Sequence, residues 1–334
     1  MHQVYVIDSV YHIYVSILLS YENYKSGKKT LLIINGEGTE GIDVYVDPLK
    51  QLKTFEDVIS VKGASAVIAL KKEGTKFDSI FRRSSTLVKL FEEFNPNLGK
   101  YHSFISDAEI NLFHIIMSKA YFLIKYPKNK FRMIEEGIGT YTKKARRIRR
   151  FKRQLLGFPQ LMGYDKQVEE ILVQNPEKMI DATLRAKASK LDLGYLLDTI
   201  NETEKKEIIN AFKLGDLEVY SKKRKVIILT QPLIKSGFKV TPEEMIAIYK
   251  GFIDNAKSKG MEIYLKLHPR EEIDYKSVFK DEDIKIIPKL LPIEVLNMDS
   301  SIYFDEAHTI CSGAIFNLKH VGETNFLGMD YLKR

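Results

Sequence analysis

The sequence is poor in cysteine and has no long apolar run. Its 334 residues include one cysteine, Cys311, which excludes an internal disulfide and any multi-cysteine metal site. A lone thiol fits a reducing compartment. No stretch of about 18 apolar residues occurs, so we expect no membrane span. The first residues, MHQVYVIDSVYHIYVSILLSY, lack the basic segment and the small-residue cleavage site of a signal peptide. We therefore expect a cytoplasmic protein.

The length and composition indicate a globular protein of two domains. A chain of 334 residues exceeds one hydrophobic core of ordinary size. Its hydrophobic content of 44% and charged content of 29% are typical of globular domains.

The net charge of +8 comes from one segment. Residues 143–153, KKARRIRRFKR, include eight of the 52 Lys and Arg, and the other 44 balance the 44 Asp and Glu. Such a local excess indicates one anionic partner, whether nucleic acid, acidic lipid or acidic polysaccharide, or else a solvated helix or loop. No nucleic-acid-binding motif and no stacking aromatic pattern accompanies the run, so we expect no nucleic-acid partner.

Apolar runs alternate with amphipathic segments in both halves of the chain. Expected strands in the first half are 4–9, 29–36, 64–70 and 130–137, and expected helices include 85–95 and 107–124, the latter capped by Asp107. Residues 151–217 are polar and helical in pattern, with few strand candidates. Expected strands in the second half are 223–233, 261–271 and 284–288. A helix after Thr241 has Pro242 at its first position, Glu244 in the capping-box place and Gly260 at its end.

This alternation predicts an α/β fold with two parallel, doubly wound sheets. We expect a first domain of residues 1–215, with a helical extension, and a second domain of residues 216–334. In such sheets ligands bind at the carboxyl ends of the strands.

Distinctive polar residues follow several expected strands. Glu135 and Glu136 end one strand before Gly137, and unpaired charges seldom end a buried strand without a use. An exposed turn is the alternative reading. His268 ends another strand beside Lys266 and Arg270, which fits either an anion site or a packed histidine. Ser312, before Gly313 and an expected helix, could bind phosphate or be an ordinary N-cap.

Three motifs together, EEGIGTY (135–141), KLHPRE (266–271) and CSGAIF (311–316), resemble those of bacterial sialyltransferases. The greatest likeness is to glycosyltransferase family 52, which includes lipooligosaccharide and capsule sialyltransferases. Bacterial polysialyltransferases carry a run similar to the first motif, but a run of serines where this chain has Cys311 and Ser312. The resemblance covers most of the chain in layout, although specific identity lies in these short motifs.

The resemblance implies a GT-B fold, with two Rossmann-like domains facing a cleft, and inverting transfer of sialic acid from CMP-sialic acid. The acceptor would be a galactose-type hydroxyl of a capsule or lipooligosaccharide glycan. Glu136 or Glu135 would be the general base, and His268 would be the general acid at the CMP phosphate. Ser312 would hold the same phosphate, and Glu294 would contact the cytidine ribose. The expected substrate-binding residues are Gly137, Gln231, Lys266, Pro269, Arg270, Glu294, Ser312 and Gly313.

No cofactor or metal is expected. The only Asp-x-Asp pair, Asp281 and Asp283, reads as a solvated turn before a strand. Part of family 52 is thought to place its base in the loop after the first strand of the second domain. That loop, LTQPLIKSG (229–237), has no carboxylate here, which favours Glu136 and leaves Glu243 and Glu244 as outside candidates.

Alternatives remain open at this stage. The chain could be a polysialyltransferase or another GT-B enzyme that uses a different nucleotide sugar. It could instead be a non-enzymatic binder of an anionic polymer or membrane through residues 143–153. The basic run suits an anionic acceptor or the acidic inner face of the cell membrane. A homodimer is compatible with each interpretation.

Overall fold

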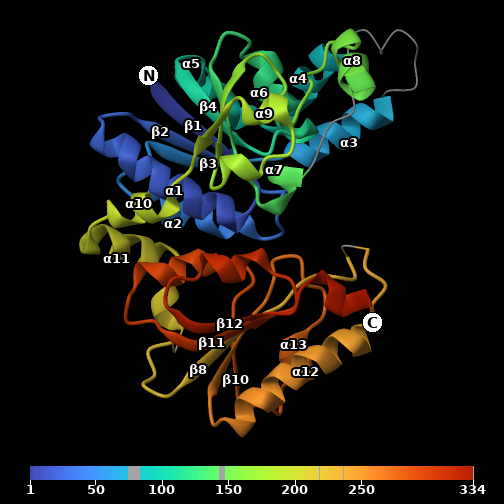
Figure 1. The fold of residues 1–334 in the computed structure, drawn as a ribbon. Helices are drawn as coiled ribbons and strands as arrows, with labels where there is room; N and C mark the ends of the chain where they lie inside the picture. Colours follow the sequence, from blue (N-terminus) through green and yellow to red (C-terminus); the bar gives the residue numbers. More distant parts are fainter. Residues whose placement is uncertain (74–82, 143–146, 218, 236, 334) are drawn as a thin grey trace. The chain divides into compact units, whose positions relative to one another are not determined.

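The protein, seen in a computed structural model, consists of two compact units, Met1–Asn201 and Glu202–Arg334 (Figure 1). Residues 1–73, 83–142, 147–217, 219–235 and 237–333 are described. The division expected between residues 215 and 216 lies earlier because helix α11 (Glu202–Ala211) packs against the 3-10 helix η7 (Ile293–Met298) of the second unit.

The first unit contains a sheet of seven parallel strands in the order β3-β2-β1-β4-β5-β6-β7. The strands are β1 (His2–Ile7), β2 (Thr30–Asn35), β3 (Asp57–Val61), β4 (Ala108–Phe113), β5 (Phe131–Ile134), β6 (Val168–Val173) and β7 (Ala188–Lys190). The α-helices are α1 (Val10–Lys25), α2 (Val46–Lys50), α3 (Gly63–Glu73), α4 (Arg83–Phe94), α5 (His102–Ser106), α6 (Ala120–Lys125), α7 (Ile138–Thr142), α8 (Arg147–Leu155), α9 (Ala182–Arg185) and α10 (Leu193–Asp198). Short 3-10 helices are η1 (Ile42–Tyr45), η3 (Pro96–Tyr101), η4 (Met117–Lys119) and η5 (Pro176–Lys178).

One face of this sheet carries a large apolar core cluster. Alternate residues of β1, such as Val4 and Val6, pack with Leu87 and Phe91 of α4 and with Phe122 of α6. Because successive side chains of a strand point to opposite faces, Gln3 and Tyr5 lie on the other face, where Asn23 of α1 donates a hydrogen bond to the Tyr5 hydroxyl (2.9 Å).

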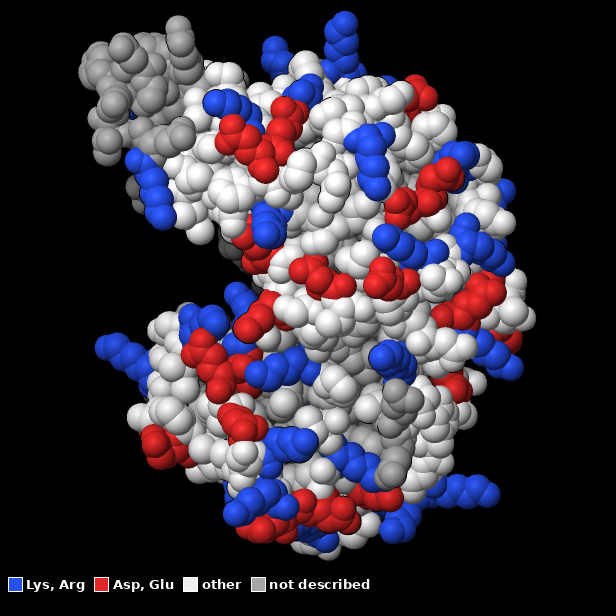
Figure 2. Space-filling view, turned by 180° about the vertical axis from the view of Figure 1, so that it is seen from behind, with Lys and Arg blue, Asp and Glu red and all other residues white. Residues whose placement is uncertain are grey.

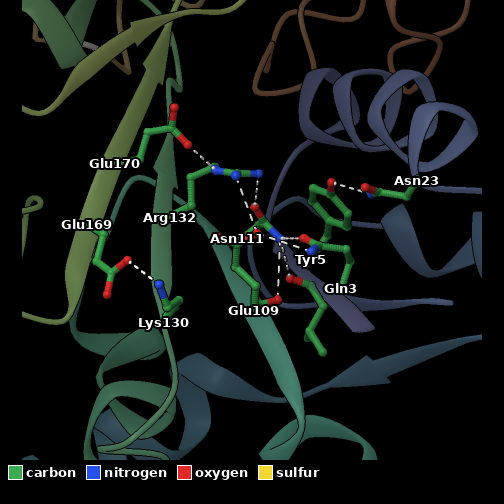
Figure 3. A network of polar contacts seen from close by, with 10 residues as sticks. Gln3, Tyr5, Asn23, Glu109, Asn111, Lys130, Arg132, Glu169 and Glu170 are labelled. Atoms are coloured by element: carbon green, nitrogen blue, oxygen red, sulfur yellow. Dashed lines mark hydrogen bonds and ion pairs between the residues drawn. The ribbon is translucent and has the colours of Figure 1, made fainter. Parts of the chain in front are cut away.

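A polar network lies across the strands on that second face (Figure 3). The fully buried Asn111 of β4 donates to the Gln3 side chain of β1 (2.9 Å), and Gln3 donates to Glu109 (3.1 Å). Arg132 of β5 bonds Glu170 of β6 (2.7 Å). The network joins four neighbouring strands and favours one register, because a slip would leave buried polar groups unpaired.

The second unit contains a sheet of five parallel strands in the order β10-β9-β8-β11-β12. The strands are β8 (Lys225–Leu229), β9 (Glu262–Lys266), β10 (Ile284–Ile287), β11 (Phe304–Thr309) and β12 (Val321–Phe326). Its remaining elements are η6 (Leu214–Asp216), α12 (Pro242–Ser258), α13 (Tyr275–Val278), η8 (Gly313–Asn317) and η9 (Met329–Lys333).

The main core of this unit lies between the sheet and helices α12 and α13, where Tyr249 of α12 meets Tyr275 of α13. The expected start of α12 is confirmed. Thr241 accepts a hydrogen bond from the Glu244 backbone N–H, and the Glu244 carboxylate accepts one from Thr241, which completes a capping box. Gly260 follows the helix with a φ of 66°.

Several sequence-based assignments are wrong. Residues 64–70 form helix α3, and the strand is the preceding β3. Residues 107–124 contain strand β4 before α6, and Asp107 is the C-cap of α5. β4 pairs with β1 and β5 in the middle of the sheet, and a strand buried on both faces cannot be distinguished from a helix by periodicity. β6 and β7 lie in the segment expected to be helical, and β12 was not foreseen.

Within the described part of the chain, no helix is both long and apolar enough to cross a bilayer.

Candidate active site

In the first unit, the polar residues after the strands gather at the point where the strand order reverses. β1 lies between β2 and β4, and the chain builds outward from it in both directions. Ligands of doubly wound sheets bind at such a switch point. Asp8 follows β1, His114 follows β4, and Glu135 follows β5. The pairing of Phe113 with Ile134 puts His114 and Glu135 side by side.

The Glu135 carboxylate is fully engaged inside the first unit. Glu135 is 1% exposed. It accepts hydrogen bonds from the Tyr11 hydroxyl (3.1 Å), from the Tyr141 hydroxyl, and from the backbone N–H (2.8 Å) and side-chain amide of Gln174. Burial and the bond to Glu135 raise the pKa of Tyr141 to about 12, so Tyr141 stays a donor at neutral pH. These bonds anchor the strand end and leave little capacity for a substrate.

The neighbouring Glu136 is open to solvent. Its side chain is 47% exposed, and His114 Nδ1 lies 3.7 Å from its Oε2. His114 has a φ of 43°, which is uncommon for a residue with a side chain. Gly137 has a φ of 140°, and a Cβ there would meet nothing within 4 Å. The two adjacent carboxylates therefore differ in availability, and Glu136 is the one able to reach a substrate.

A buried ion pair lies below this edge. Lys119 is 1% exposed, pairs with Asp8 and donates to the Phe113 carbonyl. Asn35, at the end of β2, donates to Asp8 (2.8 Å). The buried His12 has a pKa well below its ordinary value because of burial and the charge of Lys119. Asp8 and Lys119 were not among the residues expected from the sequence, although Asp8 follows an apolar strand directly, as Glu135 does.

In the second unit, the candidates gather at the corresponding reversal, between β8 and β11. Leu229, at the end of β8, pairs with Lys266 of β9 and with Thr309 of β11. The residues just beyond these three strands therefore lie at one edge. Thr230 accepts a hydrogen bond from the His268 backbone N–H (2.9 Å), and Thr309 accepts one from the Ser312 backbone N–H (3.1 Å).

His268 is held as a neutral hydrogen-bond donor. Its Nδ1 accepts a hydrogen bond from the backbone N–H of Arg270 (3.1 Å), so in the neutral ring the proton is assigned to Nε2. Burial, followed by the charges of Arg270 and Lys266, lowers the pKa of His268 to about 4. At neutral pH the Nε2–H can donate to an anion, and an anion bound there would raise the pKa again.

We expect this pKa to respond to a phosphate ligand. In the free protein His268 should titrate near pH 4, and in the presence of CMP the midpoint should rise because the phosphate stabilises the protonated ring. Histidine-selective NMR, assigned with the His268→Asn variant, measures both midpoints. An unchanged midpoint with CMP bound would remove His268 from the phosphate site.

Lys266 and Glu294 are both buried. The Lys266 ammonium donates to the carbonyls of Leu267 (2.7 Å) and Lys289 (3.1 Å). Burial lowers its pKa to about 7, against the opposing effect of Glu294. The Glu294 carboxylate accepts a hydrogen bond from Asn317 (2.8 Å), and burial raises its pKa. Both side chains are thus committed to protein groups in this structure.

Ser312 precedes the short helix η8 and is 5% exposed, but its side chain makes no capping hydrogen bond to that helix.

Gln231 and Arg270 line one small pocket of the second unit with Glu271. Asp281 and Asp283 are exposed in a turn before β10, as expected. Glu244 is occupied by the capping box of α12.

A family model, glycosyltransferase family 52, matches residues 52–326, which include Glu136, His268 and Ser312. The chain belongs to glycosyltransferase family 52. The family suggested by the three motifs is therefore confirmed. An uncharacterized protein of Haemophilus influenzae is 30% identical to this family 52 chain over 201 residues. That match spans 58% of the chain and 61% of the relative, which is less than two thirds of the relative's length.

Two solved structures have a similar fold. The GT-B domain of a sialyltransferase from Photobacterium damselae is 13% identical, with a TM-score of 0.57, and the match covers 98% of this family 52 chain and 90% of that chain. An alpha/beta-galactoside alpha-2,3-sialyltransferase from Photobacterium phosphoreum is 14% identical, also with a TM-score of 0.57, over 97% and 89% of the two chains. At these identities the likeness establishes the fold alone, and the expected GT-B class is confirmed.

Proposed function

We propose that this family 52 enzyme transfers sialic acid from CMP-sialic acid, with inversion, to a galactose-type hydroxyl of a bacterial surface glycan. The observation that carries the proposal is the strand-end edge of the second unit, where His268, with its Nδ1 occupied by the Arg270 backbone N–H and its pKa lowered, lies on the same edge as Ser312. A departing CMP requires donors of this kind, because its phosphate gains negative charge as the bond to sialic acid breaks.

His268 would act in two stages. It first donates a hydrogen bond to the phosphate. The bound anion then raises the pKa of His268 so that the ring takes up a second proton from solvent, and the resulting imidazolium gives the Nε2 proton to the departing phosphate as a general acid. The Ser312 hydroxyl and the Gly313 backbone N–H would add donors to the same phosphate oxygens. Glu294 would exchange its bond with Asn317 for the ribose hydroxyls, and Gln231 and Arg270 would border the donor.

Glu136 would act on the acceptor. As the acceptor oxygen attacks the anomeric carbon of sialic acid, its proton passes to the Glu136 carboxylate. The bond between that carbon and the phosphate oxygen of CMP breaks on the opposite face of the sugar. His114, 3.7 Å from Glu136, would orient that carboxylate. Gly137 would let the acceptor approach the backbone.

No metal is required in this scheme, because the phosphate charge is balanced by His268 and by neutral donors. Within the described residues, no three His, Cys, Asp or Glu side chains are grouped as a metal site.

The test is release of CMP from CMP-sialic acid by the full chain, with and without lactose and with EDTA. We expect lactose-stimulated release, a sialylated product and no inhibition by EDTA. Inhibition by EDTA with recovery on adding Mg²⁺ would contradict the metal-free scheme. Failure to bind or turn over CMP-sialic acid would overturn the donor, and other nucleotide sugars would then be screened.

A further inference from the structure

Helix α8 is amphipathic, but its apolar side chains face solvent, whereas those of an ordinary surface helix face the protein interior. Its three apolar side chains are exposed, with Ile148 at 72%, Phe151 at 60% and Leu155 at 63%. They are three and four residues apart, so they form one stripe along the helix. No residue of α8 is buried. A helix that only covers a core would point this stripe inward.

The side of α8 that faces the protein consists of arginines. The Arg150 guanidinium lies 3.9 Å from the centre of the Tyr164 ring, a cation–π contact. Arg153 contacts the Met117 sulfur (3.6 Å). Burial and the neighbouring Arg149 lower the pKa of Arg153. These contacts fix the orientation of α8 and hold its apolar stripe toward solvent.

Cations border the exposed stripe. Arg147 and Lys152 are exposed, and among the described residues no salt bridge involves a cation of α8. The upstream part of the basic run, residues 143–146, lies outside the described residues. On the face drawn in Figure 2, Lys and Arg are interspersed with Asp and Glu. The dense positive charge of α8 is therefore unlike the mixed surface there.

We propose that α8 lies in the surface of an anionic lipid bilayer, with Ile148, Phe151 and Leu155 inserted among the acyl chains and Arg147 and Lys152 at the headgroups. A basic helix with one apolar stripe is the form that interfacial membrane helices take. Each cation near an anionic leaflet adds to the attraction. The site acts independently of the identity of the donor sugar.

Charge and polarity select this occupant. A second copy of the chain docking through the same stripe would bring two clusters of like charge together, which opposes dimerisation. A soluble anionic polymer would pair with the cations, but it offers nothing apolar to cover the exposed Ile148, Phe151 and Leu155. An anionic bilayer satisfies both parts of the surface.

The first experiment uses the absence of tryptophan from the chain. Phe151→Trp introduces a single tryptophan within the stripe, and Tyr195→Trp introduces one at a position of similar exposure (62%) on α10 as the control. Vesicles of phosphatidylcholine with phosphatidylglycerol should shift the emission of F151W to the blue and allow its quenching by brominated acyl chains. The emission of Y195W should not change, and pure phosphatidylcholine vesicles should have a much smaller effect on F151W.

The second experiment measures binding of the full chain to the same vesicles by sedimentation. Removing the stripe with I148S/F151S/L155S should weaken binding by at least about tenfold, since membrane affinity scales with inserted apolar area. Removing two cations with R147Q/K152Q should weaken it by about fivefold per charge, and added salt should reproduce this loss. The matched controls V44S/I180S/Y195S and K128Q/K166Q remove exposed groups elsewhere in the first unit and should bind like the wild type. Circular dichroism confirms that each variant is folded.

Three outcomes would overturn the proposal. One is equal binding by wild type and the folded I148S/F151S/L155S variant. Another is cation-dependent binding to a soluble polyanion, such as polysialic acid, without any binding to vesicles. The third is a wild-type dimer that this variant abolishes, which would make a second copy the occupant. Loss of CMP release with intact vesicle binding would instead count against the proposed function alone.

Discussion

Replacing Glu136 by glutamine is expected to lower kcat for sialyl transfer by about 10²–10⁴-fold, the usual effect of losing a general base. Glutamine has the same size, and the Glu136 side chain is 47% exposed, with His114 Nδ1 3.7 Å from its carboxylate. The variant should therefore keep the wild-type melting temperature and the wild-type affinity for CMP. The rate of product formation from CMP-sialic acid and lactose measures kcat, and calorimetric titration with CMP measures the affinity for the nucleotide.

Two other glutamates supply the comparison for Glu136. Glu169→Gln changes an exposed carboxylate on β6 that pairs with Lys130 (3.0 Å), and it should leave activity unchanged. Glu135→Gln neutralises a buried carboxylate that accepts four hydrogen bonds, so it should lower the melting temperature as well as activity. Normal turnover by E136Q would place the base elsewhere, with His114 the next candidate.

Replacing His268 by asparagine is expected to reduce kcat by about 10²–10³-fold, the range for losing one donor to a developing oxyanion. The same variant should also weaken CMP binding, because His268 contacts the phosphate in the CMP complex. E136Q should leave CMP binding unchanged, because Glu136 acts on the acceptor. The contact that fixes the ring, from the Arg270 backbone N–H to Nδ1, is local, so the unit should remain folded.

The matched control for this variant is His320→Asn. His320 precedes β12 and so lies at the amino end of a strand, away from the edge that carries His268 and Ser312. The control should have wild-type turnover. If H268N keeps wild-type turnover and CMP affinity, the phosphate role of His268 is wrong, while the family assignment stands on the match over residues 52–326.

The sequence was sufficient for features that depend on neighbouring residues. The capping box of α12 uses Thr241 and Glu244, which are three residues apart, and the structure confirms it. The alternation of strands and helices predicted two parallel sheets, and both are present. The three motifs identified the family because each is a short segment. His268 could be placed at a strand end for the same reason.

Features that depend on distant residues could not be predicted. β4 was taken for part of a helix because its apolar residues are buried by β1 and β5, which are remote in sequence. Glu135 and Glu136 are indistinguishable by type and position, and only the donors Tyr11 and Gln174 separate them. The sequence also left the role of the basic run open.

The sequence by itself determined the family, the α/β class and which polar residue types follow the strands, because all three depend on short segments of the chain. The tertiary structure alone decided which carboxylate is available and which way α8 faces. Both outcomes rest on contacts between residues far apart in the chain: the hydrogen bonds that occupy Glu135, and the Tyr164 ring that holds Arg150 inward and leaves the apolar stripe of α8 exposed.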